Sequence, residues 1–252
     1  MHFHLPKPLH GWREFAGEVG IIVIGVLIAL AAEAVLEDWR WQRHVEQSTR
    51  AFKEELLIAA SDGYERMAIQ PCLQGRLRAL AAQLNGSSGQ WRAMPDQFSG
   101  ANRYYVSVLP TVYRPPTRNV LDDAWRNALA DGTINHLDLA RAQNLSGAYE
   151  SAQEFKAAEA EEGSMETRLS PLGMNRTLDQ RTRIEMLQTI AQLDRLNGLL
   201  MVDSRDLIGA LRAAKLGISQ AETEDIRKTV LDTQRGYRGA CVTALPLNLG
   251  DQ

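Results

Sequence analysis

The chain has 252 residues, a formal net charge of −3 and only two cysteines, which argues against a general nucleic-acid binder and excludes a zinc ribbon or a disulfide-dense scaffold. Helix formers such as Ala, Leu, Gln, Glu and Arg are plentiful, and no long stretch alternates apolar and polar residues with β-branched enrichment. We therefore expect an all-α fold.

The first predicted element is a transmembrane helix over residues 15–36, preceded by an N-terminal tail over residues 1–14. No residue from 19 to 32 is charged or strongly polar. At 1.5 Å per residue, the hydrocarbon core of a bilayer needs about 20 apolar residues, so the whole stretch has to be one helix. Tryptophans flank it where an aromatic belt would anchor it: Trp12, Trp39 and Trp41.

Three other interpretations of this apolar segment stay open. A buried core helix does not explain the flanking tryptophans, and an interfacial helix would need a charged face that the segment lacks. Small residues at Ala29–Ala31 and Ala32–Ala34 resemble the cleavage site of a signal peptide. However, Glu14 and Glu18 are atypical of the region that precedes such a site, so we prefer the membrane anchor.

Part of the predicted span has features of a helix-packing face. Gly25 and Ala29 are small residues four positions apart, a spacing that lets two membrane helices approach closely. Glu33 lies near the end of the span, where an ionised group costs about 2–3 kcal/mol if it is deep. Glu33 either extends to the interface or faces a partner helix. We predict that Gly25, Ala29 and Glu33 contribute to association of the span.

Flanking charges do not fix the orientation of the span. Lys7 and Arg13 precede it, and Arg40, Arg43, Arg50 and Lys53 follow it, so the two sides are nearly balanced. A long domain translocates despite local charge. We expect a cytoplasmic N-terminus and an external C-terminal domain over residues 37–252.

This domain is predicted to be an antiparallel helical bundle whose first helix continues from the span. That helix is expected to reach about Gln70, where Pro71 ends or kinks it. A second helix should extend from Cys72 to about Leu84, followed by an irregular segment over residues 86–117. Further helices are expected over residues 117–131, 136–168, 177–214 and 219–238.

Local signals mark the ends of these later helices. Gly132 is a typical C-terminal stop. Thr177 is a candidate N-cap, and Ser219 with Glu222 has the spacing of a capping box.

No catalytic, cofactor or metal site is predicted. The sequence contains no HExxH, GxSxG or GxxxxGK[ST] motif. His2 and His4 lie in the N-terminal tail, which cannot supply the oriented ligands of a physiological metal site. Paired carboxylates such as Glu54–Glu55, Asp122–Asp123 and Glu159 with Glu161–Glu162 are typical of a solvated helix face.

The irregular segment contains a candidate partner surface. Tyrosine, arginine and proline suit protein recognition, and they are concentrated between residues 104 and 116. The alternative is that the segment packs across the bundle. The residues we assign to the surface are Tyr104, Tyr105, Tyr113 and Arg114.

Cys72 and Cys241 are predicted to form a disulfide. Cys72 lies at the start of a predicted helix, and Cys241 lies just past the end of the last predicted helix. In an antiparallel bundle, such helix ends can meet at one pole of the bundle. The alternative is two unrelated core thiols. The bond would contribute about 4–5 kcal/mol in the chain-entropy model. It persists only in an oxidising compartment, and Cα atoms more than about 7 Å apart would exclude it.

The assembled residues resemble a family of uncharacterised bacterial single-span membrane proteins. The resemblance rests on three groups: Arg13–Phe15 with Glu37–Trp39; Asp123–Trp125 with Gly132, Ile134, Leu137 and Tyr149; and Cys72–Leu73 with Cys241 and Leu245–Leu247. It implies a short tail, one span in a bacterial membrane and a helical extramembrane domain. It implies no activity, because the family is uncharacterised. With the orientation expected above, the span lies in the inner membrane and the domain in the periplasm, which the cysteine pair also favours.

Our leading hypothesis is a non-enzymatic, membrane-anchored interaction protein or accessory subunit of an envelope complex. Its expected partners are the lipid bilayer and either another protein or a second copy of the chain, with no nucleic acid and no cofactor. The alternative is a periplasmic ligand-sensing bundle that acts through a separate partner. An envelope hydrolase would need a nucleophile and base that we do not find.

Overall fold

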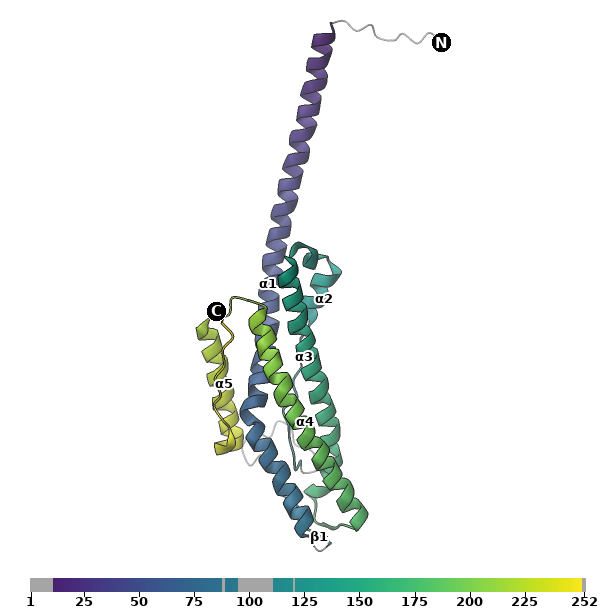
Figure 1. Cartoon of the computed structure of the whole chain (residues 1–252), viewed down its shortest axis with the longest axis vertical. Coiled ribbons are helices and arrows are strands. Elements are labelled where there is room, and N and C mark those ends of the chain that lie inside the picture. The colour runs from purple at the N-terminus through teal and green to yellow at the C-terminus, as the bar shows by residue number, and fades with distance from the viewer. Residues whose placement is uncertain (1–10, 88, 95–110, 120, 251–252) are drawn as a thin grey trace, which may run out of the picture. The chain divides into compact units, whose positions relative to one another are not determined.

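The computed structural model describes residues 11–87, 89–94, 111–119 and 121–250. Within them the fold is all-α, as predicted (Figure 1). The α-helices are α1 (Trp12–Gly86), α2 (Asp123–Ala130), α3 (Leu139–Glu166), α4 (Gln180–Ala213) and α5 (Gln220–Arg238). The 3-10 helices are η1 (Thr133–His136), η2 (Thr167–Gly173) and η3 (Gly239–Cys241), and the strands are β1 (Gln90–Trp91) and β2 (Arg176–Thr177).

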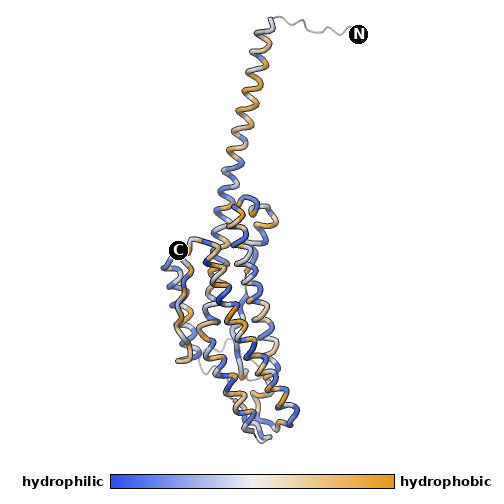
Figure 2. Tube along the Cα trace, in the orientation of Figure 1, coloured by the Kyte–Doolittle hydropathy of each residue, from blue (hydrophilic) through white to orange (hydrophobic). Residues whose placement is uncertain are grey.

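The chain divides into two compact units, unit 1 (Met1–Gln47) and unit 2 (Ser48–Gln252). The described part of unit 1 is the first part of α1, and Figure 2 shows its upper part as mostly apolar and the part below it as hydrophilic. Within the described residues, one helix is long and apolar enough to cross a membrane, and none of its most apolar window is buried. Unit 1 therefore contributes one long apolar helix.

In unit 2, α1 packs through one face. Phe52, Leu56, Ala59 and Met67 are all buried, which confirms that this part of α1 belongs to a bundle. Gly63 lies on the same face and permits a close approach to α4. A Cβ at Gly63 would lie 3.4 Å from a methyl carbon of Leu207.

Pro71 does not end α1, so the expected separate helix from Cys72 is wrong. The helix continues through Pro71 to Gly86, and Figure 1 shows it bent in its blue part, where Pro71 lies. Proline has no N–H to donate and its ring crowds the preceding turn, which loosens the helix. One turn earlier, the carbonyl of Ala68 accepts a hydrogen bond from the backbone N–H of Thr243 at 2.9 Å. The C-terminal segment, residues 241–250, therefore attaches beside the bend.

The helix stop predicted at Gly132 and the capping box predicted at Ser219 are confirmed, whereas α2 and α4 begin at other residues than expected. Gly132 has φ 81°, and Ser219 and Glu222 form a reciprocal capping box before α5. α2 begins at Asp123 instead of near residue 117. α4 is capped by Asp179, whose side chain accepts from the backbone N–H of Thr182. Thr177, the expected cap, lies in β2.

The short antiparallel pair β1–β2 was not expected from the sequence. Gln90 pairs with Thr177 and Trp91 with Arg176. The indole of Trp91 is buried and donates to the carbonyl of Leu172 at 2.8 Å. Apart from β1, the described residues between 87 and 117 have no regular structure, in agreement with the predicted irregular segment.

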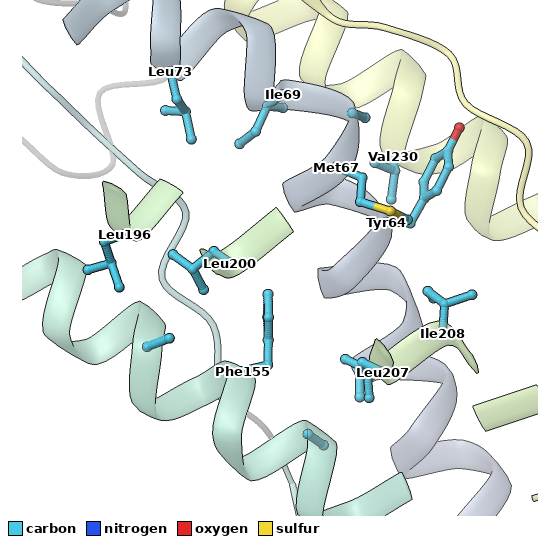
Figure 3. Packing of buried hydrophobic residues seen from close by; sticks show 14 of the residues in the cluster. Tyr64, Met67, Ile69, Leu73, Phe155, Leu196, Leu200, Leu207, Ile208 and Val230 are labelled. Carbon is cyan, nitrogen blue, oxygen red and sulfur yellow. The ribbon is translucent and has the colours of Figure 1, made fainter. Parts of the chain in front are cut away.

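The core of unit 2 is shared by four helices. α3 and α4 pack against each other side by side, and α5 flanks α1 (Figure 1). Figure 3 shows their side chains converging on one interior. Each large aliphatic or aromatic side chain buried there contributes about 1.5–3 kcal/mol relative to exposure. The labelled members are Tyr64, Met67, Ile69, Leu73, Phe155, Leu196, Leu200, Leu207, Ile208 and Val230.

Candidate functional site

A set of buried charged and polar side chains interrupts this apolar core, and we call it the charged cluster. Residues three or four positions apart on a helix share a face, so each helix presents its members together. The members are Asp62, Glu65, Arg66 and Gln70 from α1, Tyr113 and Arg118 from the segment before α2, Glu159 and Glu162 from α3, and Asn197 from α4. Arg118 is the only member that is substantially exposed, with 46 % of its side chain accessible.

At the centre of the charged cluster is an ion pair between Arg66 and Glu162. The two nitrogens Nη1 and Nη2 of Arg66 lie 2.6 and 2.9 Å from the two carboxylate oxygens of Glu162. Both side chains are 0 % exposed. Burial lowers the pKa of Arg66 but the charge of Glu162 raises it, and the net direction is upward. Arg66 therefore stays charged, and it is held in the core by two hydrogen bonds to Glu162.

Asn197 and Tyr113 complete the coordination of this pair. The Asn197 side-chain oxygen accepts from Arg66 at 2.8 Å, and its amide nitrogen donates to the Tyr113 hydroxyl at 2.7 Å. That hydroxyl donates to Glu162 at 2.6 Å. Burial, together with the charge of Glu162, raises the pKa of Tyr113. These bonds join α1, α3, α4 and the segment before α2 at one level of the bundle.

Tyr113 therefore corrects one prediction. We assigned it to an exposed partner surface, but its side chain is 0 % exposed and its hydroxyl is used inside the charged cluster. The neighbouring Arg114 is half-buried, and its carbonyl accepts from Arg238 at 2.9 Å. The segment packs across the bundle, which was the stated alternative. Tyr104 and Tyr105 lie outside the described residues.

On the α5 side, Glu65 is held by two partners. Arg118 donates to both carboxylate oxygens of Glu65 at 3.0 Å each. Gln234 of α5 donates to one of these oxygens at 2.7 Å. Glu65 thus connects α1 to α5 and to the segment before α2.

Two buried carboxyl groups of the cluster are left incompletely paired. Neither oxygen of Glu159 has a hydrogen-bond partner, and the same is true of one oxygen of Asp62. Glu159 is 2 % exposed and Asp62 6 %. Burial raises the pKa of Glu159 to about 8, with the charges of Asp62, Glu162 and Glu65 adding to the effect and that of Arg66 opposing it. Burial and the charge of Glu65 raise the pKa of Asp62 to about 7, against the opposing charge of Arg118.

An unpaired ionised carboxylate inside a protein is costly, and protonation removes that cost. Glu159 therefore binds a proton at neutral pH, and Asp62 titrates there. The arrangement can take up and release protons near neutrality, and it has no nucleophile–base pair. Among the described residues no group of three or more His, Cys, Asp or Glu side chains is placed to hold a metal ion.

The predicted disulfide is formed and fastens the C-terminal segment to α1. Cys72 and Cys241 are joined, with their Cα atoms 5.1 Å apart. Cys72 is a buried residue inside α1, not at a helix start as we expected, whereas Cys241 is exposed. Near the disulfide, the hydroxyl of Tyr64 donates to the carbonyl of Leu245 at 2.9 Å. The segment is therefore held by a covalent bond and by hydrogen bonds.

We expect reduction of the disulfide, or the double substitution Cys72→Ser and Cys241→Ser, to lower the free energy of unfolding by about 2–5 kcal/mol, because the bond restricts a long loop of the unfolded chain. Denaturant unfolding with and without reductant measures the difference. The serine variant serves as the control, since reductant should not change it further. Equal stability with and without reductant would contradict the prediction.

The predicted helix-packing residues lie in unit 1 and are exposed. Gly25, Ala29 and Glu33 all belong to the uncovered part of α1. A Cβ added at Gly25 would meet no atom within 4 Å. Their role in association of the span stays a prediction.

Sequence analysis did not identify the charged cluster, although a signal for it was present. Leu145, Tyr149, Ala152 and Phe155 mark the buried face of α3, and the same helical spacing continues to Glu159 and then to Glu162. Glutamates at positions that continue an apolar stripe are the signal. We interpreted the acidic residues of this region as a solvated face, and for Glu159 and Glu162 that was wrong.

The fold and its cluster define an all-α protein with one long apolar helix and a disulfide-bonded helical unit. No protein-family model, curated protein or solved structure matches the chain.

Proposed function

We propose that the protein is a membrane-anchored, non-enzymatic interaction protein or accessory subunit of an envelope complex. Residues 15–36 form its single span in a bacterial inner membrane, with a cytoplasmic N-terminus and unit 2 in the periplasm. The observation that carries the proposal is the uncovered apolar helix of unit 1.

That helix is apolar on every side. Successive residues of an α-helix point about 100° apart, so four consecutive residues sample its whole circumference. The four residues from Ile21 to Ile24 are 74 %, 65 %, 49 % and 58 % exposed. A helix that is hydrophobic all round belongs in a membrane or in a large core, and no described residue covers this one. A bilayer removes this apolar surface from water.

The disulfide supports the proposed orientation. Protein disulfides form and persist in oxidising compartments such as the periplasm, whereas cytosolic thiols are kept reduced. Cys72 and Cys241 both lie in unit 2, so the bond favours a periplasmic location for that unit. Flanking charges are nearly balanced and lean slightly toward the opposite orientation, but a long domain can translocate despite local charge.

We expect the full-length protein to stay in the membrane pellet after extraction at alkaline pH. Ile24→Lys with Leu27→Lys should move it into the soluble fraction, since each Lys at the centre of a span costs about 2.5–3.5 kcal/mol on insertion scales. Gln42→Lys with Gln47→Lys adds the same charge outside the span and should leave the protein in the pellet. Release of the unaltered full-length chain would refute the anchor, and a product beginning near Glu33 would show cleavage.

The charged cluster favours a second candidate function, a periplasmic sensing bundle that acts through a separate partner. Its specific support is the pair of buried carboxyl groups, Asp62 and Glu159, that titrate near neutral pH. Purification in mild detergent followed by mass spectrometry separates the two functions. A stoichiometric protein partner favours the accessory subunit, and a small molecule bound in unit 2 favours the sensor.

A further inference from the structure

We propose that the seam between α3 and α4 of unit 2 docks an amphipathic helix of a second protein, with a cluster of Lys or Arg at one end of that helix. The inference deepens the proposed interaction function and rests on it.

A groove of about 430 Å³ opens on this seam. Its apolar lining comes from Met165 of α3 and from Leu196 and Leu199 of α4. Glu161 of α3 and Arg195 of α4 also line it, and both are exposed. Because its two walls are packed helices, the groove is a fixed feature of the bundle, as a docking site for a helix requires.

The apolar surface continues beyond the groove along α4. Leu199 and Val202 are each 51 % exposed, and they lie four and seven positions after Arg195, on the same face of the helix. These two half-exposed aliphatic side chains extend the apolar surface of the groove along α4, and an elongated apolar surface suits the apolar face of an amphipathic helix. This geometry sets the shape of the occupant.

The charges beside the groove indicate which residues the docked helix should carry. Four and seven residues after Leu199, α4 contributes Asp203 and Asp206, and Glu154 of α3 is close enough for its charge to act on Asp203. Burial, followed by the charges of Glu154 and Asp206, raises the pKa of Asp203, so these carboxylates are close enough to repel one another. None of the three forms an ion pair with a residue in the part of the chain that the structure describes. An incoming cluster of Lys or Arg would relieve that repulsion.

The same charges disfavour a second copy of the chain as the occupant. Two copies meeting through this seam would bring two acidic groups together, and like charges placed opposite each other oppose association. Only Arg195 offers a positive charge in the groove itself. A basic helix has no such penalty, and its end nearest Asp203 would be the basic one.

The test is photo-crosslinking of the full-length protein in intact cells that naturally produce it, with a photoreactive phenylalanine analogue at Leu199 or, separately, at Val202. The same analogue at Ile184, an exposed α4 residue outside the groove, is the matched control. We expect adducts from the two seam positions and none from Ile184. Sequencing of the adducts by mass spectrometry should give an amphipathic segment with clustered Lys or Arg.

Charge neutralisation gives the second measurement. Glu154→Gln, Asp203→Asn and Asp206→Asn together should lower the adduct yield about ten-fold, because three attractive charges are removed. Asp225→Asn with Asp232→Asn neutralises exposed carboxylates on α5 and should leave the yield within about two-fold. Adducts with a second copy of this chain, adducts with an acidic or uncharged segment, equal effects of both sets of substitutions, or no adduct at all would each overturn the inference. Release from the membrane at alkaline pH would refute the anchor alone, so the two failures are distinguishable.

Discussion

Arg66→Met is expected to lower the free energy of unfolding by about 3–5 kcal/mol, because it leaves Glu162 charged and unpaired in the core. Arg66 makes two hydrogen bonds to Glu162 and one to Asn197, and no part of its side chain reaches solvent. Methionine fills a similar volume, so the loss reflects the charge more than a cavity. Urea unfolding of the full-length protein in one fixed detergent measures the change.

A double-mutant cycle tests the cause of that loss. Glu162→Leu alone should also be strongly destabilising, since it leaves Arg66 buried without a counter-charge. The double variant, Arg66→Met with Glu162→Leu, should cost less than the sum of the single variants, because it leaves no isolated charge. Arg126→Met, which breaks exposed ion pairs to Asp122 and Asp123, should change stability by at most about 0.5–1 kcal/mol. Additive losses in the cycle would contradict the buried-pair interpretation.

The parts of the fold that the sequence predicts well are those with local causes. The Gly132 stop and the Ser219 capping box depend on a few neighbouring residues, and both are present as expected. The continuation of α1 through Pro71 has a non-local cause, because the C-terminal segment bonds to Ala68 and Cys72 there. These contacts hold the C-terminal segment against α1 next to Pro71, and the sequence around Pro71 does not show them.

The disulfide could be predicted from the sequence, whereas the charged cluster, which has a non-local cause, could not. With only two cysteines, the pairing of Cys72 with Cys241 had one alternative, and the structure decides between them. The charged cluster depends on which faces of α1 and α3 turn toward each other. Periodicity predicts that Phe155 is buried, but it does not reveal that Arg66 lies opposite Glu162. The periodicity of the sequence therefore predicts the bundle, but it does not predict the polar groups at the centre of the bundle.

The unpaired carboxyl groups lead to an expected pH dependence: these two groups should lower stability by about 6–7 kcal/mol as the pH rises from 5 to 9. Glu159 and Asp62 have pKa values of about 8 and 7 in the folded chain, against 4.5 and 3.8 for the free side chains. Between those values the folded chain holds more protons than the unfolded chain. Raising the pH therefore favours unfolding, and the contribution of each group is fully lost once the pH exceeds its folded-state pKa.

Other titratable groups of unit 2 also affect how stability changes with pH. Burial raises the pKa of Glu166 to about 7, which adds to the fall in stability in the same range. Glu222, whose pKa is lowered to about 2 by Lys53 and Ser219, acts only in acid, where its protonation destabilises the fold. The facing cations Arg66 and Arg118 stay charged throughout, since their pKa values are raised. The decline between pH 5 and 9 therefore reports the buried carboxyl groups.

Glu159→Gln with Asp62→Asn should make the protein more stable than the unaltered chain at pH 9 and should remove most of the decline. An amide of the same shape stays uncharged at every pH, so only the titration is lost. Asp225→Asn with Asp232→Asn, on the exposed face of α5, is the matched control and should leave the slope unchanged. Urea unfolding at a series of pH values, in a buffer of constant ionic strength, gives all three curves. A stability that stays flat or rises between pH 6 and 9 in the unaltered chain would mean that Glu159 and Asp62 are ionised in the folded core.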